Sequence, residues 1–336
     1  MGKSNTDNQK NKNMPKISVI IPLYNGKKFI KKTLDRVFNQ SYKDFEVIVI
    51  NDGSTDNPED VLKNYLSKIK YIIQPNSGCP AGAKNRGIRE SSGEYLAFLD
   101  QDDLWMENKL KIQVEVLDKY PKIGLVATNA IVFKDETKKK IGIYWKKAKN
   151  ILTSKEAQKK LSKENFIISS SAVMVRSIVF DKGVYCDERL KLADDYELWY
   201  RIAKKWSFAL ILKPLLYYRN NSQSLSKNKN KLFKDLIFIN KIFSQDKSLT
   251  KEERKYAQEQ IALFNFRLAN NCMTLDNYSE AKQIYQMLKK QQKFRRKIKI
   301  IESLDNVSPK MAGFALKLNR TILEQGHTGP NLNITV

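Results

Sequence analysis

The expected fold of this chain is organised around one segment, Glu94-Tyr95-Leu96-Ala97-Phe98-Leu99-Asp100-Gln101-Asp102-Asp103. Its first half is an apolar run of strand-forming residues behind a Ser-Ser-Gly turn, which is typical of a buried β-strand. Three carboxylates then follow within four positions. Ligands of open α/β sheets bind beyond the carboxyl ends of the strands, and crowded carboxylates require a cation or hydrogen-bond donors among them. The stretch therefore predicts a buried strand that ends at a ligand site.

The acidic triplet also has a simpler interpretation, in which Asp102 or Asp103 caps a helix that follows near Trp105. A divalent ion that holds a diphosphate needs only one or two protein carboxylates, because phosphate oxygens and water complete its shell. Short acidic motifs often arise by chance. The rest of the chain therefore has to decide between a helix cap and a metal site.

The composition indicates a globular protein of about two domains, with 336 residues of which 41% are hydrophobic. A formal net charge of +25 indicates an anionic partner: nucleic acid, an acidic membrane surface or a phosphorylated substrate. The sequence has no secretory signal and no apolar run of membrane-spanning length.

The cysteines and the single histidine exclude several kinds of site. Cys79, Cys186 and Cys272 have neither metal-binding nor disulfide spacing, so we expect reduced thiols in the cytoplasm. His327 is the only histidine and lies near the end of the sequence, which argues against histidine catalysis and histidine metal sites.

Strand and helix patterns alternate along the first two thirds of the chain, which predicts an α/β fold with a mostly parallel central sheet. After residue 226 strand signals stop and helix-forming residues dominate. We expect a disordered leader at residues 1–14, an α/β domain at 15–227, a helical domain at 228–325 and a loose tail at 326–336. The expected strands lie at residues 16–22, 45–50, 69–73, 95–99, 123–127 and 166–175, and at 208–212 and 215–218 on either side of Pro214.

Polar residues suited to a nucleotide diphosphate follow several of these strands or lie in the adjoining loops. A parallel sheet brings such positions to one edge, where aromatic and carboxylate groups suit a base and ribose and basic groups suit phosphate. Taken singly, Tyr24 could be a packing residue, Asp52 a turn former and Lys84 a solvated charge, but their coincidence favours a site. The nucleotide-binding candidates are Pro22, Tyr24, Asn25, Asp52, Ser54, Lys84, Asn85, Asp100 and Gln101, and the metal candidate is Asp102.

Four segments together resemble the inverting family 2 glycosyltransferases: Ser18-Val19-Ile20-Ile21-Pro22-Leu23-Tyr24-Asn25, Val49-Ile50-Asn51-Asp52-Gly53-Ser54-Thr55-Asp56, Ala83-Lys84-Asn85-Arg86-Gly87-Ile88 and 93–103. The resemblance covers about residues 16–226 and implies a GT-A-type Rossmann-like sandwich. It further implies that Tyr24 and Asp52 contact the base, Asp100 the ribose, and Asp102 a metal at the diphosphate.

The same resemblance identifies Asp195 in Ala193-Asp194-Asp195-Tyr196-Glu197-Leu198 as the general base, with Asp194 beside it. Inversion by one displacement requires a group that takes the proton of the attacking hydroxyl, and a positioned carboxylate can do so. The two acids could equally form a helix N-terminus, and both roles are compatible. The family often has Glu where this chain has Asp194. It also often has a histidine near the position of Asn221, in a loop with Arg219 that closes over the diphosphate. This chain has neither the Glu nor the histidine at these positions.

The sequence therefore predicts a metal-dependent glycosyltransferase that uses Mn²⁺ or Mg²⁺ and a nucleotide-diphosphate sugar, UDP-linked, for surface polysaccharide or glycolipid synthesis. The acceptor would be a saccharide or a lipid-linked sugar. A sugar nucleotidyltransferase would need a glycine-rich basic loop after the first strand, and a dehydrogenase would need G-x-G-x-x-G there; neither motif is present. A non-enzymatic nucleic-acid-binding protein is disfavoured, because no recognised nucleic-acid module appears.

A basic stretch at residues 289–299 holds seven Lys and Arg residues and no acid, with apolar residues between them. Such a helix suits the anionic surface of a membrane, although a solvated helix face explains it equally well. We expect a cytoplasmic protein that lies at the inner face of the cell membrane through this stretch. Pairing of two subunits through the helical region is left open.

Overall fold

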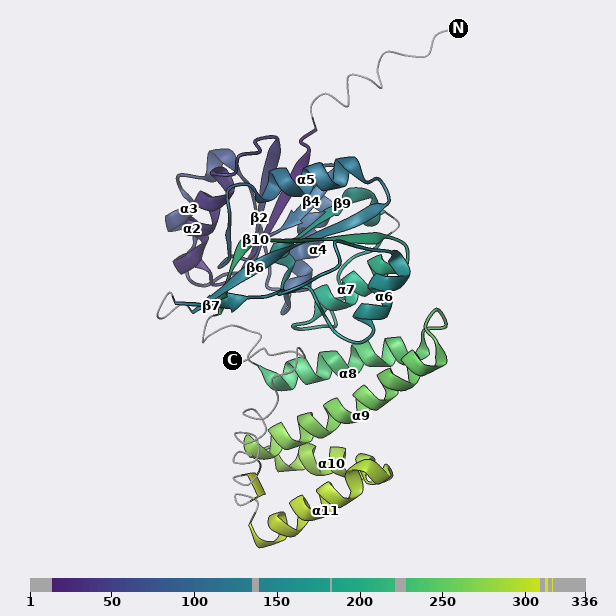
Figure 1. The fold of residues 1–336 in the computed structure, drawn as a ribbon. Coiled ribbons are helices and arrows are strands. Elements are labelled where there is room, and N and C mark those ends of the chain that lie inside the picture. Colours follow the sequence, from purple (N-terminus) through teal and green to yellow (C-terminus); the bar gives the residue numbers. More distant parts are fainter. Residues whose placement is uncertain are drawn as a thin grey trace. The chain divides into compact units, whose positions relative to one another are not determined.

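The computed structural model describes residues 14–134, 139–181, 183–220 and 228–308, together with residues 312, 313 and 316. The chain forms two compact units, one of residues 1–161 and 165–222 and the other of residues 162–164 and 223–336 (Figure 1). The expected tail and, apart from Met14, the expected leader lie outside the described residues.

Within the described residues, a ten-stranded sheet of order β3-β2-β1-β4-β9-β6-β10-β5 forms the centre of the first unit, with β7 paired to β6 and β8 to β10. Strands β1 to β4 pair in parallel, as do β6 and β10, whereas β9 runs antiparallel to β4 and β6. The predicted α/β fold with a mostly parallel sheet is confirmed. The strands are β1 Ile17–Leu23, β2 Phe45–Asp52, β3 Lys70–Gln74, β4 Tyr95–Phe98, β5 Leu104–Trp105, β6 Ile123–Lys134, β7 Lys140–Ile143, β8 Ile151–Leu152, β9 Val173–Arg176 and β10 Ser207–Asn220.

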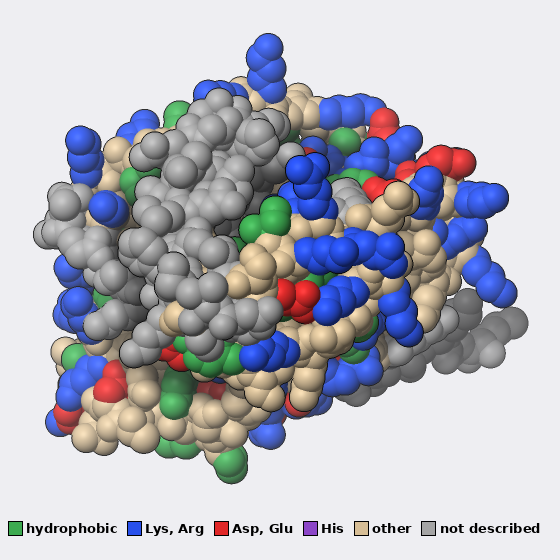
Figure 2. Space-filling model, turned by 90° about the horizontal axis from the view of Figure 1, so that it is seen from below, with side chains coloured by type: hydrophobic (Ala, Val, Ile, Leu, Met, Phe, Trp, Pro, Cys, Tyr) green, Lys and Arg blue, Asp and Glu red, His purple; other side chains and the backbone are tan. Residues whose placement is uncertain are grey.

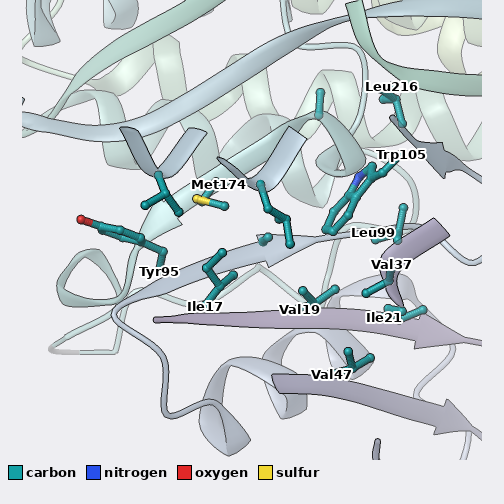
Figure 3. Packing of buried hydrophobic residues seen from close by; sticks show 14 of the residues in the cluster. Ile17, Val19, Ile21, Val37, Val47, Tyr95, Leu99, Trp105, Met174 and Leu216 are labelled. Atoms are coloured by element: carbon teal, nitrogen blue, oxygen red, sulfur yellow. The ribbon is translucent and has the colours of Figure 1, made fainter. Parts of the chain in front are cut away.

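Helices cover this sheet and explain why its central strands are apolar throughout. Strand β1 is buried on both faces, so its residues do not alternate between apolar and polar. Figure 3 shows Ile17, Val19 and Ile21 of β1 pointing to one face, on the side of Leu99 and Trp105. The helices of this unit are α2 Lys27–Phe38, α3 Glu59–Leu62, α4 Pro80–Glu90, α5 Lys109–Lys119, α6 Ser154–Leu161 and α7 Asp194–Ala203.

Two expected strands differ from the structure. Pro214 does not divide the last strand, because β10 continues through it with register shifts on both sides of the proline. A bulge accommodates a residue that cannot donate a backbone hydrogen bond. The strand expected over residues 166–175 begins only at Val173, because Ser169 accepts a bond from Ser171 N and starts a 3₁₀ turn.

The second unit consists of helices that contact one another in sequence order: α8 Lys229–Gln245, α9 Lys251–Thr274, α10 Tyr278–Leu288 and α11 Gln292–Val307 (Figure 1). Thr250 and Glu253 form a reciprocal capping box that fixes the start of α9. Within the described part of the chain, no helix is both long and apolar enough to span a membrane. Figure 2 shows Lys and Arg side chains spread over the visible face, where Asp and Glu side chains are few.

Candidate active site

The loops after β1 and β4 are joined by the side chain of Gln101. Its amide nitrogen donates to Tyr24 O (3.0 Å), and its amide oxygen accepts from Tyr24 N (2.8 Å). Gly26 makes room for this contact, because a Cβ atom there would lie 2.3 Å from Gln101 Oε1. The Tyr24 side chain remains 43% exposed, so its ring can meet a ligand.

A second set of bonds joins the loops after β1 and β2. Asn25 has a left-handed backbone (φ 49°), its N–H donates to Ser54 Oγ (3.1 Å), and its side-chain oxygen accepts from Thr55 N (2.8 Å). Pro22 lies opposite Ile50 near the carboxyl end of β1. The predicted residues Pro22, Tyr24, Asn25, Ser54 and Gln101 therefore lie on one continuous edge of the sheet.

Asp52 closes the end of β2 and is buried. Its carboxylate accepts bonds from Gln74 Nε2 (2.6 Å), Ser77 Oγ (2.8 Å) and Ser77 N (3.1 Å). A base that contacts Asp52 would therefore meet a carboxylate already oriented by three donors. Sequence reasoning missed Gln74, although its position at the end of β3, beside the end of β2, could have indicated it.

A buried ion pair joins helices α4 and α7 beside the acidic residues of the site. Lys84 Nζ lies 3.0 Å from Asp194 Oδ2, and the two side chains are 7% and 2% exposed. Burial by itself disfavours the ammonium, but the carboxylates of Asp194, Asp195 and Asp100 outweigh it and raise the pKa of Lys84. We expected Lys84 to meet phosphate, which stays a prediction; in the structure its ammonium pairs with Asp194 of α7.

Asp195 lies in the first turn of α7 next to this ion pair. Burial raises the pKa of Asp195 to about 7; the Lys84 ammonium opposes this shift, and Asp194 and Asp100 add to it. Burial likewise raises the pKa of Asp100, again against the effect of Lys84. A carboxyl group that titrates near neutral pH can take a proton from a hydroxyl and release it again.

The side chain of Asn85 holds the loop that precedes α7. Its amide nitrogen donates to Cys186 O (3.0 Å) and Glu188 Oε1 (2.8 Å), and its amide oxygen accepts from Cys186 N (2.8 Å). These bonds hold residues 186–188 against α4. The side chain of this predicted nucleotide-binding residue is thus engaged within the chain.

Arg219 of β10 holds the acidic loop. Its backbone N–H donates to Asp103 Oδ1 (2.9 Å), its Nε donates to Asp102 O (2.7 Å), and its guanidinium lies over the rings of Phe29 and Phe133. Arg219 therefore fixes the direction of the loop that carries Asp102. Asn221, the other residue predicted in the diphosphate loop, lies outside the described residues.

A divalent ion at the acidic loop would have to be held mainly by its ligand, because the loop offers few protein groups for it. Burial raises the pKa of Asp103 well above its usual range, and the charges of Asp102 and Asp100 add to the shift. A nearby cation would relieve the repulsion between these carboxylates. No group of three His, Cys, Asp or Glu residues in the described ranges is arranged as a metal cage. Asp102 would thus be the protein ligand, with phosphate oxygens and water completing the shell.

Ser171 and Tyr218 are further residues at this site that sequence reasoning missed. Ser171 Oγ accepts from Asp100 N (2.9 Å), and Ser171 O accepts from the Trp105 indole N–H (2.8 Å). Burial, followed by the charges of Asp103, Asp100, Asp102 and Asp195, raises the pKa of Tyr218. Tyr218 therefore lies among the acids as a neutral phenol.

Comparison with solved structures identifies the fold. The chain matches S. aureus TarS in complex with UDP-GlcNAc at a TM-score of 0.60 and 18% identity, over 81% of this chain and 80% of that one. It matches the mannosyltransferase PcManGT of Pyrobaculum calidifontis, in complex with GDP-Man and Mn²⁺, at a TM-score of 0.54 and 15% identity, over 95% and 89% of the two chains. The fold is that of the GT-A glycosyltransferases.

Sequence comparison supplies the family. Residues 18–183 match the model of Glycosyl transferase family 2, and the chain belongs to this family, as its motifs predicted. An uncharacterized glycosyltransferase of Rickettsia typhi is 33% identical over 195 residues, which are 56% of this chain and 59% of that protein. One of Rickettsia prowazekii is 29% identical over 260 residues, 74% and 80% of the two chains. The chain thus spans 59% of the length of the Rickettsia typhi relative.

Proposed function

We propose that this enzyme transfers a sugar from a nucleotide diphosphate to an acceptor hydroxyl with inversion at the anomeric carbon. The observation that carries the proposal is the group of Lys84, Asp100, Asp194 and Asp195, in which a carboxyl group with a pKa of about 7 lies beside a buried ion pair. The family match supports glycosyl transfer as the reaction class.

In the proposed reaction Asp195 accepts the proton of the acceptor hydroxyl as its oxygen attacks the anomeric carbon. The new carbon–oxygen bond forms on the face opposite the leaving group, and the bond from the anomeric carbon to the diphosphate oxygen breaks with its electron pair. Lys84 holds Asp194 (3.0 Å), and its positive charge favours the ionised form of Asp195. Asp195 thus begins as the carboxylate and ends with the proton.

A bound divalent ion would neutralise charge on the leaving diphosphate. Asp102 would hold this ion. Arg219 would keep Asp102 in place, because its Nε donates to the backbone carbonyl oxygen of Asp102 (2.7 Å). The Mn²⁺ in the similar mannosyltransferase structure supports a metal of this kind.

We further propose a UDP-linked donor, for which the TarS complexes with UDP and UDP-GlcNAc are the support. Tyr24, Asn25, Asp52 and Ser54 would surround the base, and Asp100 would contact the ribose. The acceptor would be a saccharide or a lipid-linked sugar of the cell surface.

The donor can be tested by thermal unfolding of the full chain with UDP, GDP or AMP, each with and without Mn²⁺. We expect the largest rise in melting temperature with UDP and Mn²⁺ together, and a smaller rise for Asp102→Asn. A nuclear magnetic resonance assay of the product then reports the anomeric configuration. A product that retains the donor configuration would rule out single displacement with Asp195 as base.

The basic helix α11 is proposed to contact an anionic membrane surface. Phe294, Ile298 and Ile301 are buried, whereas Arg295, Arg296, Lys297 and Lys299 are exposed. Lys289 forms an ion pair with Glu302 (2.7 Å), so the basic face begins beyond it. Such a face, with Ile300 exposed among the bases, suits the surface of a bilayer.

A further inference from the structure

The first unit carries an apolar rim, which we define as the side chains of Ile141, Ile143, Tyr144, Ile151 and Leu212. These side chains are 55%, 45%, 38%, 39% and 40% exposed, respectively. Single exposed apolar residues are ordinary on protein surfaces, but a gathering of large ones marks an interaction site.

Several contacts bring the rim residues into one area although they come from separate segments. Ile143 of β7 lies opposite Ile131 of β6. The Asn129 amide of β6 donates to both Trp145 O (2.9 Å) and Leu212 O (3.0 Å). Asn150 O accepts from Leu210 N (2.7 Å), which brings the segment before Ile151 against β10.

The rim is also basic. Residues 139–149 hold five lysines and no acid, and all five are exposed: Lys139, Lys140, Lys146, Lys147 and Lys149. Lys149 forms an ion pair with Glu156 (2.5 Å). Among the strands that the structure describes, β7 pairs with β6 alone, and lysines along such an edge disfavour pairing with a second copy. An anionic surface is the complementary partner.

The rim is connected to the acidic loop through neighbouring strands. Tyr217 of β10 lies opposite Ile131 of β6, which in turn lies opposite Ile143 of β7. Two residues further along β10, Arg219 donates to Asp102 O. A partner that covers the rim therefore lies beside the strand ends at which we propose that the sugar is transferred.

We propose that the rim docks on an anionic lipid bilayer, with Ile141, Ile143 and Tyr144 entering the boundary between headgroups and acyl chains. The lysines around them meet the negatively charged headgroups. This contact is separate from α11 and belongs to the unit that holds the site. The rim contact would present the site to a lipid-linked acceptor, and this consequence rests on the proposed function. The docking of the rim on a bilayer does not rest on it.

The test uses the full chain and sedimentation with vesicles of phosphatidylcholine, with or without phosphatidylglycerol. We expect binding to the anionic vesicles only, weakened by salt because exposed charges are screened within about 10 Å at 0.1 M. Ile141→Ser/Ile143→Ser should lower partition by about tenfold or more, from lost apolar burial. Lys146→Gln/Lys147→Gln should also lower the partition onto anionic vesicles by about tenfold or more, because each lysine near the surface contributes roughly fivefold.

A matched control replaces two residues of comparable exposure near the opposite edge of the sheet, Leu66→Ser/Ile73→Ser, and should leave partition unchanged. Equal partition of wild type and both rim variants would overturn the proposal, as would an equal loss in the control. So would concentration-dependent dimers that disappear only in the rim variants, since the rim would then bind a second copy. Because no donor or acceptor is present, the result does not depend on whether the transfer reaction is assigned correctly.

Discussion

Two adjacent isosteric substitutions, Asp194→Asn and Asp195→Asn, should change stability in opposite directions at pH 8. Asp194 pairs with Lys84 at 3.0 Å, with both side chains almost fully buried. Its replacement leaves the Lys84 ammonium without its closest counter-charge, and breaking a buried pair in this way costs about 3–5 kcal/mol. For a unit of this size, about 1 kcal/mol corresponds to roughly 2–4 °C in melting temperature. We expect Asp194→Asn to melt about 10 °C below wild type.

Asp195 behaves differently because its pKa in the folded protein is about 7, against an ordinary value of 3.8. The folded state binds this proton more tightly than the unfolded state, so the stability contributed by the group falls as pH rises from about 4 through about 7. The shift corresponds to at most about 4 kcal/mol. Asp195 is only half-buried, so solvent screening reduces the gain expected from Asp195→Asn at pH 8 to the order of 1–2 kcal/mol. At pH 5 the folded-state carboxyl is neutral while the unfolded one is still ionised, so the gain should fall to less than half of its value at pH 8 and should vanish only below about pH 4.

The assay is thermal unfolding of the three proteins at pH 5 and pH 8, with Asp194→Glu as a control that keeps a carboxylate for Lys84. The same Asp195→Asn variant should lose turnover by about two to four decades, the range for a missing general base. A variant that is more stable yet inactive separates this role from a structural one. The reasoning would be refuted if Asp195→Asn gave the same stability change at both pH values, or if Asp194→Asn were no more harmful to folding than Asp195→Asn.

Three further predictions concern other parts of the chain. Asp102→Asn should abolish transfer while the fold persists, and chelation should do the same, reversibly with Mn²⁺ or Mg²⁺, because a neutral amide is a poor ligand for a hard cation; full activity in excess chelator would exclude a metal. Gly26→Ala should cost about 1–3 kcal/mol of stability by overpacking and raise the KM for the donor, since its Cβ would displace Gln101 from the Tyr24 backbone; unchanged unfolding and kinetics would contradict this. Arg295→Glu/Arg296→Glu/Lys297→Glu should weaken binding to anionic vesicles, beyond what the rim retains, without stopping hydrolysis of the donor; equal binding of the variant and wild type would leave α11 as a solvated surface.

The sequence by itself was sufficient for the parallel core of the sheet and for the loops at its carboxyl edge. Strand β1 is apolar throughout because both of its faces are covered, and this pattern is visible without any knowledge of its neighbours. The acidic triplet after β4 is also visible in the sequence, although the neighbouring motifs were needed to favour a ligand site over a helix cap. Both features depend on residues that are close together in the sequence, so they can be recognised without the rest of the fold.

The groups that each charged residue meets became known from the folded arrangement of the chain. Lys84 and Asp194 are 110 positions apart, and Arg219 and Asp103 are 116 apart. No local pattern encodes such a pairing, because it depends on which helix and which strand become neighbours when the sheet closes. Burial then changes what a charged residue can do. At a surface Lys84 would suit a phosphate, but inside the fold it is the counter-charge of Asp194 and opposes the rise in the pKa of Asp195.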